Sequence, residues 1–184
     1  YPDKHFDLAI VDPPYSDETA GLNVGTGKRA FKLASFKKPG PEYFAELRRV
    51  SREQIVWGGN WLADMLPPSS GFVVWHKHQN GHFSECEVAW VSHGKARHFD
   101  RPYQADIGNK IHPTQKPVAL YDWLLANYAK PGQRILDTHL GSGSHAIAAH
   151  YFGAHLTACE IDPDYYAAAM ARIKRETAQQ TLFT

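Results

Sequence analysis

Short apolar runs alternate with amphipathic segments along the chain, and this alternation predicts most of its secondary structure. The first apolar run ends at Pro-Pro and predicts a strand over residues 6–12 that is buried on both faces. Residues 41–50 have the spacing of a short amphipathic helix that begins with proline. A further strand is expected at 54–57, and two more at 72–76 and 87–91 would form a hairpin.

The last third of the chain alternates between expected strands and expected helices. The strands are expected at 134–137 and 156–161. The first helix is expected at 114–129, with Thr114 as N-cap. The second helix would run from a glycine turn to Tyr151, and the third from Pro163 to about Thr177. Strand–helix–strand–helix segments of these lengths are typical of βαβ units, which build a parallel sheet covered by helices. We therefore predict an α/β fold with a mostly parallel sheet and helices on both faces.

The composition is that of a soluble globular protein. With 184 residues, 43% of them hydrophobic, the chain is long enough for a single domain over 1–184. No membrane partner is expected, because no apolar stretch could span a bilayer and no signal-peptide pattern opens the chain. The two cysteines make no disulfide framework, which favours a cytoplasmic location. The net charge is only +1, so any contact with nucleic acid must come from a local basic patch.

A glycine-rich turn follows the expected strand at 134–137. It has the sequence Asp137-Thr138-His139-Leu140-Gly141-Ser142-Gly143. A strand that turns through glycines into a helix exposes backbone N–H groups and a helix N-terminus to a ligand. Taken alone, the turn is equally consistent with a tight connection that binds nothing.

Glu160, near the end of the next expected strand, strengthens the ligand interpretation. An acidic residue about 20 residues beyond a glycine turn can accept hydrogen bonds from both ribose hydroxyls of a nucleoside. A pyrophosphate cofactor would favour a third glycine where this chain has Ala146. A nucleoside without phosphates fits better, and S-adenosylmethionine is such a cofactor.

The polar segment at 111–117, Ile-His-Pro-Thr-Gln-Lys-Pro, lies at the start of the expected helix. Its hydroxyl, amide and N–H groups can hold a carboxylate such as a methionine tail. Without the other motifs, it would be interpreted as a proline-bounded helix start with an incidental lysine.

The tetrapeptide Asp12-Pro13-Pro14-Tyr15 ends the first expected strand. A carboxylate and a backbone carbonyl can accept both hydrogens of an adenine amine and direct its lone pair towards an incoming methyl group. Tyr15 would stack on the base, which must leave the duplex to be reached. The alternative is a simple Pro-Pro turn with Tyr15 in the core.

Together these segments resemble the amino-methyltransferases of DNA, which methylate adenine N6 or cytosine N4. The tetrapeptide precedes the 111–117 segment, which precedes the glycine turn and Glu160, and this order is similar to the beta class. Residues 56–61 and 83–90 also resemble the small methylases of phages and prophages. The resemblance implies a Rossmann-like S-adenosylmethionine-dependent methyltransferase fold and a bacterial or phage-infected cell.

The resemblance also assigns roles to individual residues. Asp12 would bind the target amine with help from the Pro13 carbonyl, and Tyr15 would stack on the base. Glu160 would bind the ribose of S-adenosylmethionine, and Asp162 would approach its adenine. The whole cofactor set, which would release S-adenosylhomocysteine as product, comprises Asp12, His112, Thr114, Lys116, Asp137, Thr138, His139, Leu140, Gly141, Ser142, Gly143, Glu160 and Asp162.

Two departures from the family pattern concern cofactor packing and target recognition. His139 stands where the family usually has Phe, and no separate target-recognition domain precedes residue 111. Recognition would then rest on loops 16–40 and 92–110, which predicts a short or relaxed target sequence. The candidate DNA contacts in these loops are Lys28, Arg29, Lys37, Lys38, Lys95, Arg97 and Arg101.

The end of the chain resembles the short peptides by which bacterial proteins hold the sliding clamp. Gln179 would supply polar hydrogen bonds, and Leu182 with Phe183 would fill an apolar pocket. Alternatively these two side chains fold back onto the domain or belong to a frayed end. Beta-class relatives are often dimers, but no segment of this chain indicates an interface.

Adenine N6 methylation of DNA is the preferred function, because the family more often has Ser in place of Asp12 when it methylates cytosine N4. Cytosine N4 remains the nearest alternative. An RNA methyltransferase, which would carry Trp where Tyr15 stands, and a non-catalytic DNA-binding relic are further alternatives. The reaction needs no metal, so His76, His78 and His82 are expected to be loop histidines rather than zinc ligands.

Overall fold

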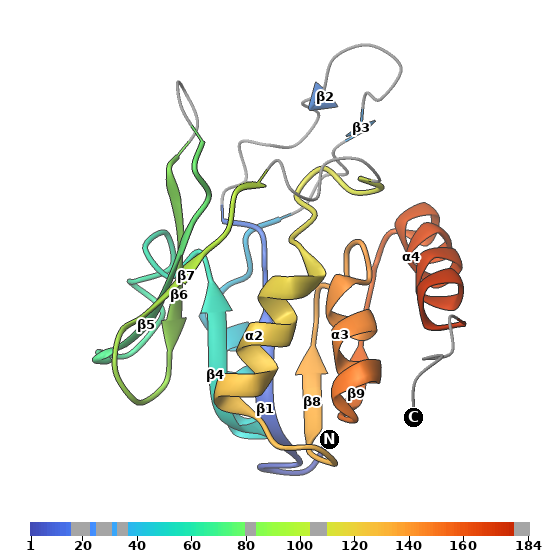
Figure 1. Cartoon of the computed structure of the whole chain (residues 1–184). Helices are drawn as coiled ribbons and strands as arrows, with labels where there is room; N and C mark the ends of the chain where they lie inside the picture. Colours follow the sequence, from blue (N-terminus) through green and yellow to red (C-terminus); the bar gives the residue numbers. More distant parts are fainter. Residues whose placement is uncertain (16–22, 25–30, 33–36, 80–83, 104–109, 179–184) are drawn as a thin grey trace.

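A seven-stranded sheet forms the centre of the protein, in the order β7-β5-β6-β4-β1-β8-β9 (Figure 1). The computed structural model describes residues 1–15, 23–24, 31–32, 37–79, 84–103 and 110–178. The strands are β1 (Phe6–Val11), β4 (Ser51–Trp57), β5 (Gly71–His76), β6 (Cys86–Val91), β7 (Arg97–Asp100), β8 (Arg134–Asp137) and β9 (His155–Ala158). The short strands β2 (Asn23–Val24) and β3 (Phe31–Lys32) form a separate antiparallel pair.

The sheet is mostly parallel, as predicted. Strand β1 pairs in parallel with β4 and β8, and β8 pairs in parallel with β9. Strand β6 is antiparallel to both of its neighbours, β4 and β5, while β7 is parallel to β5. Strands β1, β4, β5, β7, β8 and β9 therefore all end at the same edge of the sheet, here called the C-terminal edge. Side chains that follow these strands are brought together there.

Helices cover both faces of the sheet, which confirms the predicted α/β architecture. They are α1 (Pro41–Val50), α2 (Val118–Tyr128), α3 (Ser144–Phe152) and α4 (Pro163–Thr177). Because successive strand side chains point to opposite faces, Leu8 and Ile10 pack with α2 and α3, while Ala9 and Val11 pack with α1. Figure 1 shows α2 and α3 in front of the sheet. None of the described helices has the length and apolarity needed to cross a membrane.

The predicted helix at 114–129 begins later than expected, and Thr114 is not its N-cap. Helix α2 begins at Val118, with Pro117 in extended backbone as the N-cap residue. A proline disfavours helical geometry in the residue before it, so Lys116 cannot belong to the helix. Thr114 lies instead in the turn that leads to Lys116, four residues before the helix begins.

Two other segments differ from their predictions. Strand β9 ends at Ala158, so Glu160 lies in the turn before α4 rather than in a strand. The expected loop at 92–110 contains strand β7, whose residues alternate between intermediate and exposed. Its sequence Arg-His-Phe-Asp offers one apolar side chain, and a half-exposed strand at the edge of a sheet leaves too weak a pattern to predict.

Candidate functional site

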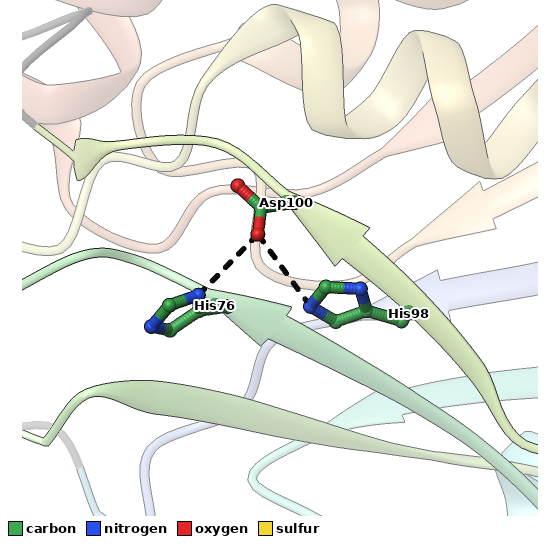
Figure 2. A group of neighbouring side chains, drawn as sticks. All are labelled: His76, His98 and Asp100. Atoms are coloured by element: carbon green, nitrogen blue, oxygen red, sulfur yellow. Dashed lines mark hydrogen bonds and ion pairs between the residues drawn. The ribbon is translucent and has the colours of Figure 1, made fainter.

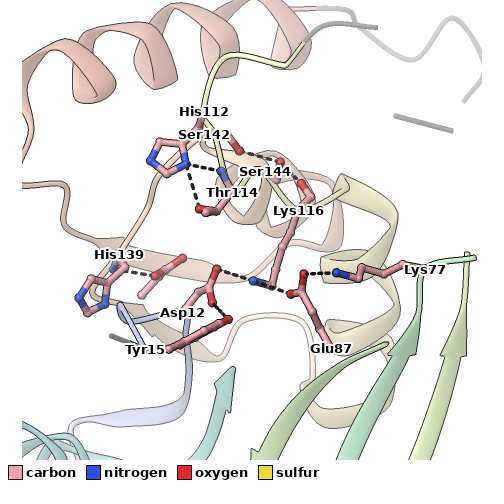
Figure 3. Close-up of polar contacts among 11 residues, drawn as sticks. Asp12, Tyr15, Lys77, Glu87, His112, Thr114, Lys116, His139, Ser142 and Ser144 are labelled. Atoms are coloured by element: carbon pink, nitrogen blue, oxygen red, sulfur yellow. Dashed lines mark hydrogen bonds and ion pairs between the residues drawn. The ribbon is translucent and has the colours of Figure 1, made fainter. Parts of the chain in front are cut away.

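Asp12 lies at the C-terminal edge of the sheet, directly after β1, where it meets Tyr15 and Lys116 (Figure 3). Tyr15 Oη donates a hydrogen bond to Asp12 Oδ1 over 2.6 Å. Lys116 Nζ donates to Asp12 Oδ2 over 2.5 Å. Each carboxylate oxygen therefore has one protein donor, and its remaining lone pair can accept another hydrogen bond.

Lys116 is buried, with 5% of its side chain exposed, and two carboxylates surround its ammonium. Besides Asp12, it contacts Glu87 Oε2 at 3.2 Å, and Glu87 Oε1 accepts a hydrogen bond from Lys77 Nζ over 3.1 Å. Asp12 and Glu87 thus balance the charges of Lys116 and Lys77, as Figure 3 shows. We call these four residues the charged quartet. Because a buried charge is costly without a partner, each member depends on the others.

Contacts within the quartet keep Lys116 and Glu87 charged. Burial would lower the pKa of Lys116, but the attraction of Asp12 and Glu87 outweighs it, and the pKa is raised. Burial would raise the pKa of Glu87, but Lys116 and Lys77 outweigh it, and the pKa is lowered. Burial, together with Asp12 and Glu87, raises the pKa of Tyr15 well above its usual value. Tyr15 therefore stays protonated and donates to Asp12.

Gly58 supports the ring of Tyr15. The residue follows β4 and has φ +73°, a conformation that favours glycine. A Cβ atom at this position would lie 2.2 Å from Tyr15 Cε1 and 2.3 Å from Cδ1, so one side of the ring rests directly on the Gly58 backbone. Glycine at position 58 is thus required both by the backbone conformation and by the close approach of Tyr15.

Asp137, the last residue of β8, organises the glycine turn. Its Oδ1 accepts the backbone N–H of His139 over 2.9 Å, and its Oδ2 lies 2.9 Å from Nδ1 of the buried His145 in α3. The His145 ring in turn stacks on Tyr121 of α2, with centroids 4.7 Å apart. Gly141 and Gly143 both have positive φ, at +54° and +78°, which lets the turn run from β8 into α3.

Glu160 closes the other side of the glycine turn. Its Oε2 accepts the Gly141 N–H over 2.8 Å, and its Oε1 accepts the Asp162 N–H over 3.0 Å. Asp162 caps α4 by accepting the N–H groups of Asp164 and Tyr165. Between the two carboxylates, Ile161 is 88% exposed, which is unusual for a large apolar side chain. The turn therefore offers an apolar surface beside a fixed carboxylate.

His112 and Thr114 lie beside the glycine turn. The His112 ring is 3.7 Å from the position of a Cβ on Gly141, and it contacts the Tyr165 ring edge-on at 4.4 Å. Burial, with a smaller contribution from Lys110 and Lys116, lowers the pKa of His112 to about 4. A neutral imidazole agrees with the role of His112 Nδ1, which accepts the Thr114 N–H over 3.4 Å.

Two serines connect the glycine turn to Lys116. Ser144 Oγ donates to the Lys116 carbonyl oxygen over 2.7 Å and lies 3.1 Å from Ser142 Oγ. Arg172 of α4, itself buried, donates from Nη1 to Ser144 Oγ over 2.9 Å and to the Ser142 carbonyl over 3.1 Å. The backbone of Lys116 is therefore attached to the turn while its side chain holds Asp12.

Helix α1 contributes Tyr43, which covers the position of His139. Tyr43 Oη is 2.6 Å from Thr138 Oγ1, which is itself 2.9 Å from His139 Nδ1. The rings of Tyr43 and His139 meet at 5.8 Å, and burial lowers the pKa of His139. The His139 imidazole thus packs against the aromatic ring of Tyr43 in α1, a contact that an apolar side chain could also make.

The structure brings most of the predicted site residues to the C-terminal edge, together with several that the sequence did not indicate. Asp12, Tyr15 and Lys116 form one group, and the turn residues with His112, Thr114, Glu160 and Asp162 form the next. The prediction missed Lys77, Glu87, Tyr43 and His145. Glu87 belongs to β6 and Lys77 directly follows β5, its antiparallel neighbour, so only the register of these two strands could have indicated their contact.

The candidate DNA contacts are dispersed. Lys37 is exposed, and Lys38 Nζ donates to the Trp61 carbonyl over 3.3 Å. Lys95 lies between β6 and β7, and Arg97 is the first residue of β7. Both are therefore far from the C-terminal edge that carries Asp12, at the opposite ends of the strands. Arg97 Nη1 donates to Asn127 of α2. Arg101 directly follows β7 and lies at the C-terminal edge. Lys28, Arg29, Gln179, Leu182, Phe183 and His82 fall outside the described residues.

Comparison with known proteins agrees with this arrangement. Residues 52–171, well over half of the chain, match the model of the N6/N4 DNA methylase family. Over 66 residues the chain is 35% identical to the Escherichia coli (strain K12) protein YubD, which is a methylase by name. That match covers 36% of this chain and 29% of YubD, so the chain spans less than a third of this relative.

Several solved structures have a similar fold. The M1.HpyAVI–SAM complex has a TM-score of 0.61 and 17% identity, over 95% of this chain and 89% of that chain. The cytosine-N4-specific PvuII DNA methyltransferase has a TM-score of 0.62 and 13% identity, over 97% of this chain and 85% of that chain. At these identities the similarity concerns the fold.

The charged quartet predicts that Lys116 is important for stability. Lys116→Met keeps the volume of the side chain but leaves the carboxylates of Asp12 and Glu87 close together without their shared cation. We expect the free energy of unfolding, measured in urea, to fall by about 3 kcal/mol. Glu46→Gln, which breaks the exposed ion pair with Arg49, should change it little. Equal unfolding midpoints for Lys116→Met and the wild type would contradict the quartet.

The lowered pKa of His112 predicts a specific pH dependence of stability. In the unfolded chain His112 takes up a proton near its usual pKa of 6.5, whereas in the folded protein it resists protonation down to about 4. Between these values the unfolded state binds more protons, so stability falls as the pH falls. From pH 7 to pH 5 the wild type should lose about 2 kcal/mol more than His112→Gln. Parallel pH profiles of urea unfolding would show that His112 is not buried in a neutral form.

Proposed function

The chain belongs to the N6/N4 DNA methylase family, and on that premise we propose that it methylates adenine N6 in DNA. The methyl donor would be S-adenosylmethionine, and the products N6-methyladenine and S-adenosylhomocysteine. The observation that carries the proposal is the Asp12 carboxylate, held at the C-terminal edge by Tyr15 and Lys116. The substrate, the donor and the roles below are parts of this proposal.

Asp12 is suited to hold an amine. Each of its oxygens has one protein donor and spare acceptor capacity, and the side chain is only 16% exposed. An adenine amine is a poor nucleophile because its lone pair is delocalised into the ring. A fixed acceptor for one N–H, with the backbone carbonyl of the buried Pro13 for the other, would draw the nitrogen towards tetrahedral geometry. Rate enhancement would then come from orientation and from electrostatic stabilisation.

Tyr15 is suited to stack on the base. One side of its ring rests on Gly58, and its hydroxyl is fixed on Asp12. The ring can therefore neither rotate away nor move back when a base lies against it. A base stacked on Tyr15 would present its exocyclic amine to the Asp12 carboxylate, because the two groups belong to one hydrogen-bonded unit.

The glycine turn is suited to S-adenosylmethionine. The carboxylates of Asp137 and Glu160 are fixed by backbone N–H groups and retain lone pairs for an ammonium and for ribose hydroxyls. The exposed side chain of Ile161 offers an apolar surface for the adenine ring. When bound, the cofactor would supply a methyl group that moves in line from the sulfonium to the amine nitrogen.

The quartet would help to stabilise the positive charge that develops on the amine nitrogen during the reaction. The amine nitrogen becomes positive as it accepts the methyl group, and it then loses a proton. The Asp12 carboxylate would stabilise that charge by accepting a hydrogen bond from the N–H group, whose proton then passes to solvent. Lys116 and Glu87 would act as positioning residues, because they orient Asp12 without touching the base.

Cytosine N4 is the second candidate target. It is favoured by the fold similarity to the cytosine-N4-specific PvuII enzyme. A cytosine also presents an exocyclic amine next to a ring nitrogen, so Asp12 and Tyr15 could hold either base. Asp12 supports adenine, because members of the family that methylate cytosine N4 more often have Ser at this position. A non-catalytic relic is disfavoured because Asp12 and both glycines of the turn are present.

The proposal predicts a selective loss of turnover in Asp12→Asn. The variant keeps the shape of the side chain but removes its charge, so transfer of labelled methyl groups from S-adenosylmethionine to duplex DNA should fall about 10²–10³-fold. Cofactor affinity, measured by calorimetry, should change little. Asp64→Asn, at an exposed site, is the control and should retain wild-type turnover. Single-stranded DNA and RNA are tested in parallel, and transfer to RNA alone would reject the DNA assignment.

A pair of glycine variants tests the role of Tyr15. Gly58→Ala would place a methyl group inside the Tyr15 ring, whereas Gly132→Ala has nothing among the described residues within 4 Å of its Cβ, although its φ is also positive, at +80°. Both should lose some stability from the backbone conformation. Only Gly58→Ala should lower turnover, about tenfold or more, because a base stacked on an aromatic ring gains about 1–3 kcal/mol. Equal turnover in the two variants would exclude a stacking role for Tyr15.

A further inference from the structure

A second polar cluster lies at the outer edge of the sheet, away from the charged quartet. His76, His98 and Asp100 come from β5 and β7 and point towards one another (Figure 2). Among the described residues, these three form the group whose ligand atoms all lie within 4.8 Å of one another. Asp100 Oδ2 is 3.4 Å from His76 Nδ1 and 3.9 Å from His98 Nε2.

The register of two parallel strands builds this cluster. His76 is the direct partner of Asp100 in the β5–β7 pair, and His98 is the partner of Val74. His98 and Asp100 are two residues apart on one strand, so their side chains point to the same face of the sheet. Two imidazoles and one carboxylate therefore converge from regular strands, whose backbone hydrogen bonds hold them in place.

The distances from Asp100 Oδ2 to the two imidazole nitrogens are near those of a metal centre. Zinc binds imidazole nitrogen and carboxylate oxygen at about 2.0–2.2 Å, so two ligands of a tetrahedral site lie about 3.3 Å apart. The observed separations of 3.4 and 3.9 Å from Asp100 Oδ2 are close to that value. Small side-chain rotations would suffice to bring both imidazoles and the carboxylate around one ion.

A third imidazole fixes the carboxylate from its other side. His78 Nε2 lies 2.5 Å from Asp100 Oδ1, and its ring lies tilted against the ring of His76, with centroids 4.1 Å apart. His78 has φ +52°, a backbone conformation that residues other than glycine rarely adopt. Such a conformation persists where the surroundings require it, and here it brings the ring of His78 to Asp100. Orienting a ligating carboxylate in this way is typical of metal sites.

We propose that His76, His98 and Asp100 bind a divalent transition-metal ion such as Zn²⁺, with His78 orienting the Asp100 carboxylate. Two imidazoles and one carboxylate are a ligand set that zinc and its neighbours in the periodic table prefer. The site is accessible to an ion from solvent, since the side chains of His76, Asp100 and His98 are 34%, 49% and 58% exposed. Water would complete the coordination.

The proposed ion would have a structural role. It would cross-link β7, the outermost strand of the sheet, to β5. The next residue after His76 is Lys77, whose carbonyl accepts the Tyr103 N–H and whose side chain reaches Glu87 of the quartet. Binding at this edge would therefore stabilise the end of β5, which Lys77 of the quartet directly follows. Methyl transfer itself does not require the ion, so this inference is independent of the proposed reaction.

The test measures metal binding by the untagged 184-residue chain after treatment with a chelator, because an affinity tag of histidines would itself bind metal. Titration with Co²⁺, followed by visible absorption and by displacement with Zn²⁺, should show one bound equivalent. His98→Gln and Asp100→Asn should each weaken Zn²⁺ binding at least about tenfold. Saturating Zn²⁺ should raise the melting temperature of the wild type more than that of either variant.

Two variants serve as matched controls. His155→Gln removes an exposed histidine at the opposite edge of the sheet, and Cys86→Ser removes the thiol of the residue paired with His76 in β6. Both should bind Zn²⁺ as the wild type does. The proposal would be overturned if the wild type bound no Zn²⁺, if His98→Gln bound it as tightly as the wild type, or if His155→Gln lost it equally.

Discussion

The ion pair between Lys116 and Asp12 is the contact on which the rest of the site depends. It joins two residues 104 positions apart and attaches the end of β1 to the segment before α2. Lys116 is buried, so its charge requires Asp12 and Glu87, and Glu87 in turn requires Lys77. Removing one member would leave a charge without compensation. The same need for charge compensation keeps Asp12 in one position before any substrate binds.

The backbone of Lys116 extends this constraint to the glycine turn. Ser144 binds the Lys116 carbonyl, and Arg172 of α4 binds Ser144. One residue thus contacts the proposed base site with its side chain and the proposed cofactor site with its backbone. In-line transfer of a methyl group needs two reactants at a fixed distance and angle, and a shared residue between their sites is a direct way to achieve this. The family of the chain, established over residues 52–171, is consistent with such a reaction.

Local patterns predicted much of the fold, whereas contacts between distant segments could not be predicted. Helix α1, strand β8 and helix α4 have the expected bounds because their periodicity and proline starts are local signals. Strand β7 was missed because it lies at an edge and has little apolar content. Asp12 and the glycine turn could be recognised from their motifs. Lys116 was expected in the cofactor pocket, but its side chain reaches Asp12, a pairing that only the three-dimensional fold defines. The same holds for His76, His98 and Asp100, which converge through the register of β5 and β7.

The proposed role of Asp12, held by Lys116 and Tyr15, is to present the amine of an adenine for methylation. This role is tested by incubating the protein with S-adenosylmethionine and duplex DNA of mixed sequence, then digesting the DNA to nucleosides for mass spectrometry. We expect N6-methyladenine. The appearance of N4-methylcytosine without N6-methyladenine, or of no methylated nucleoside, would contradict it.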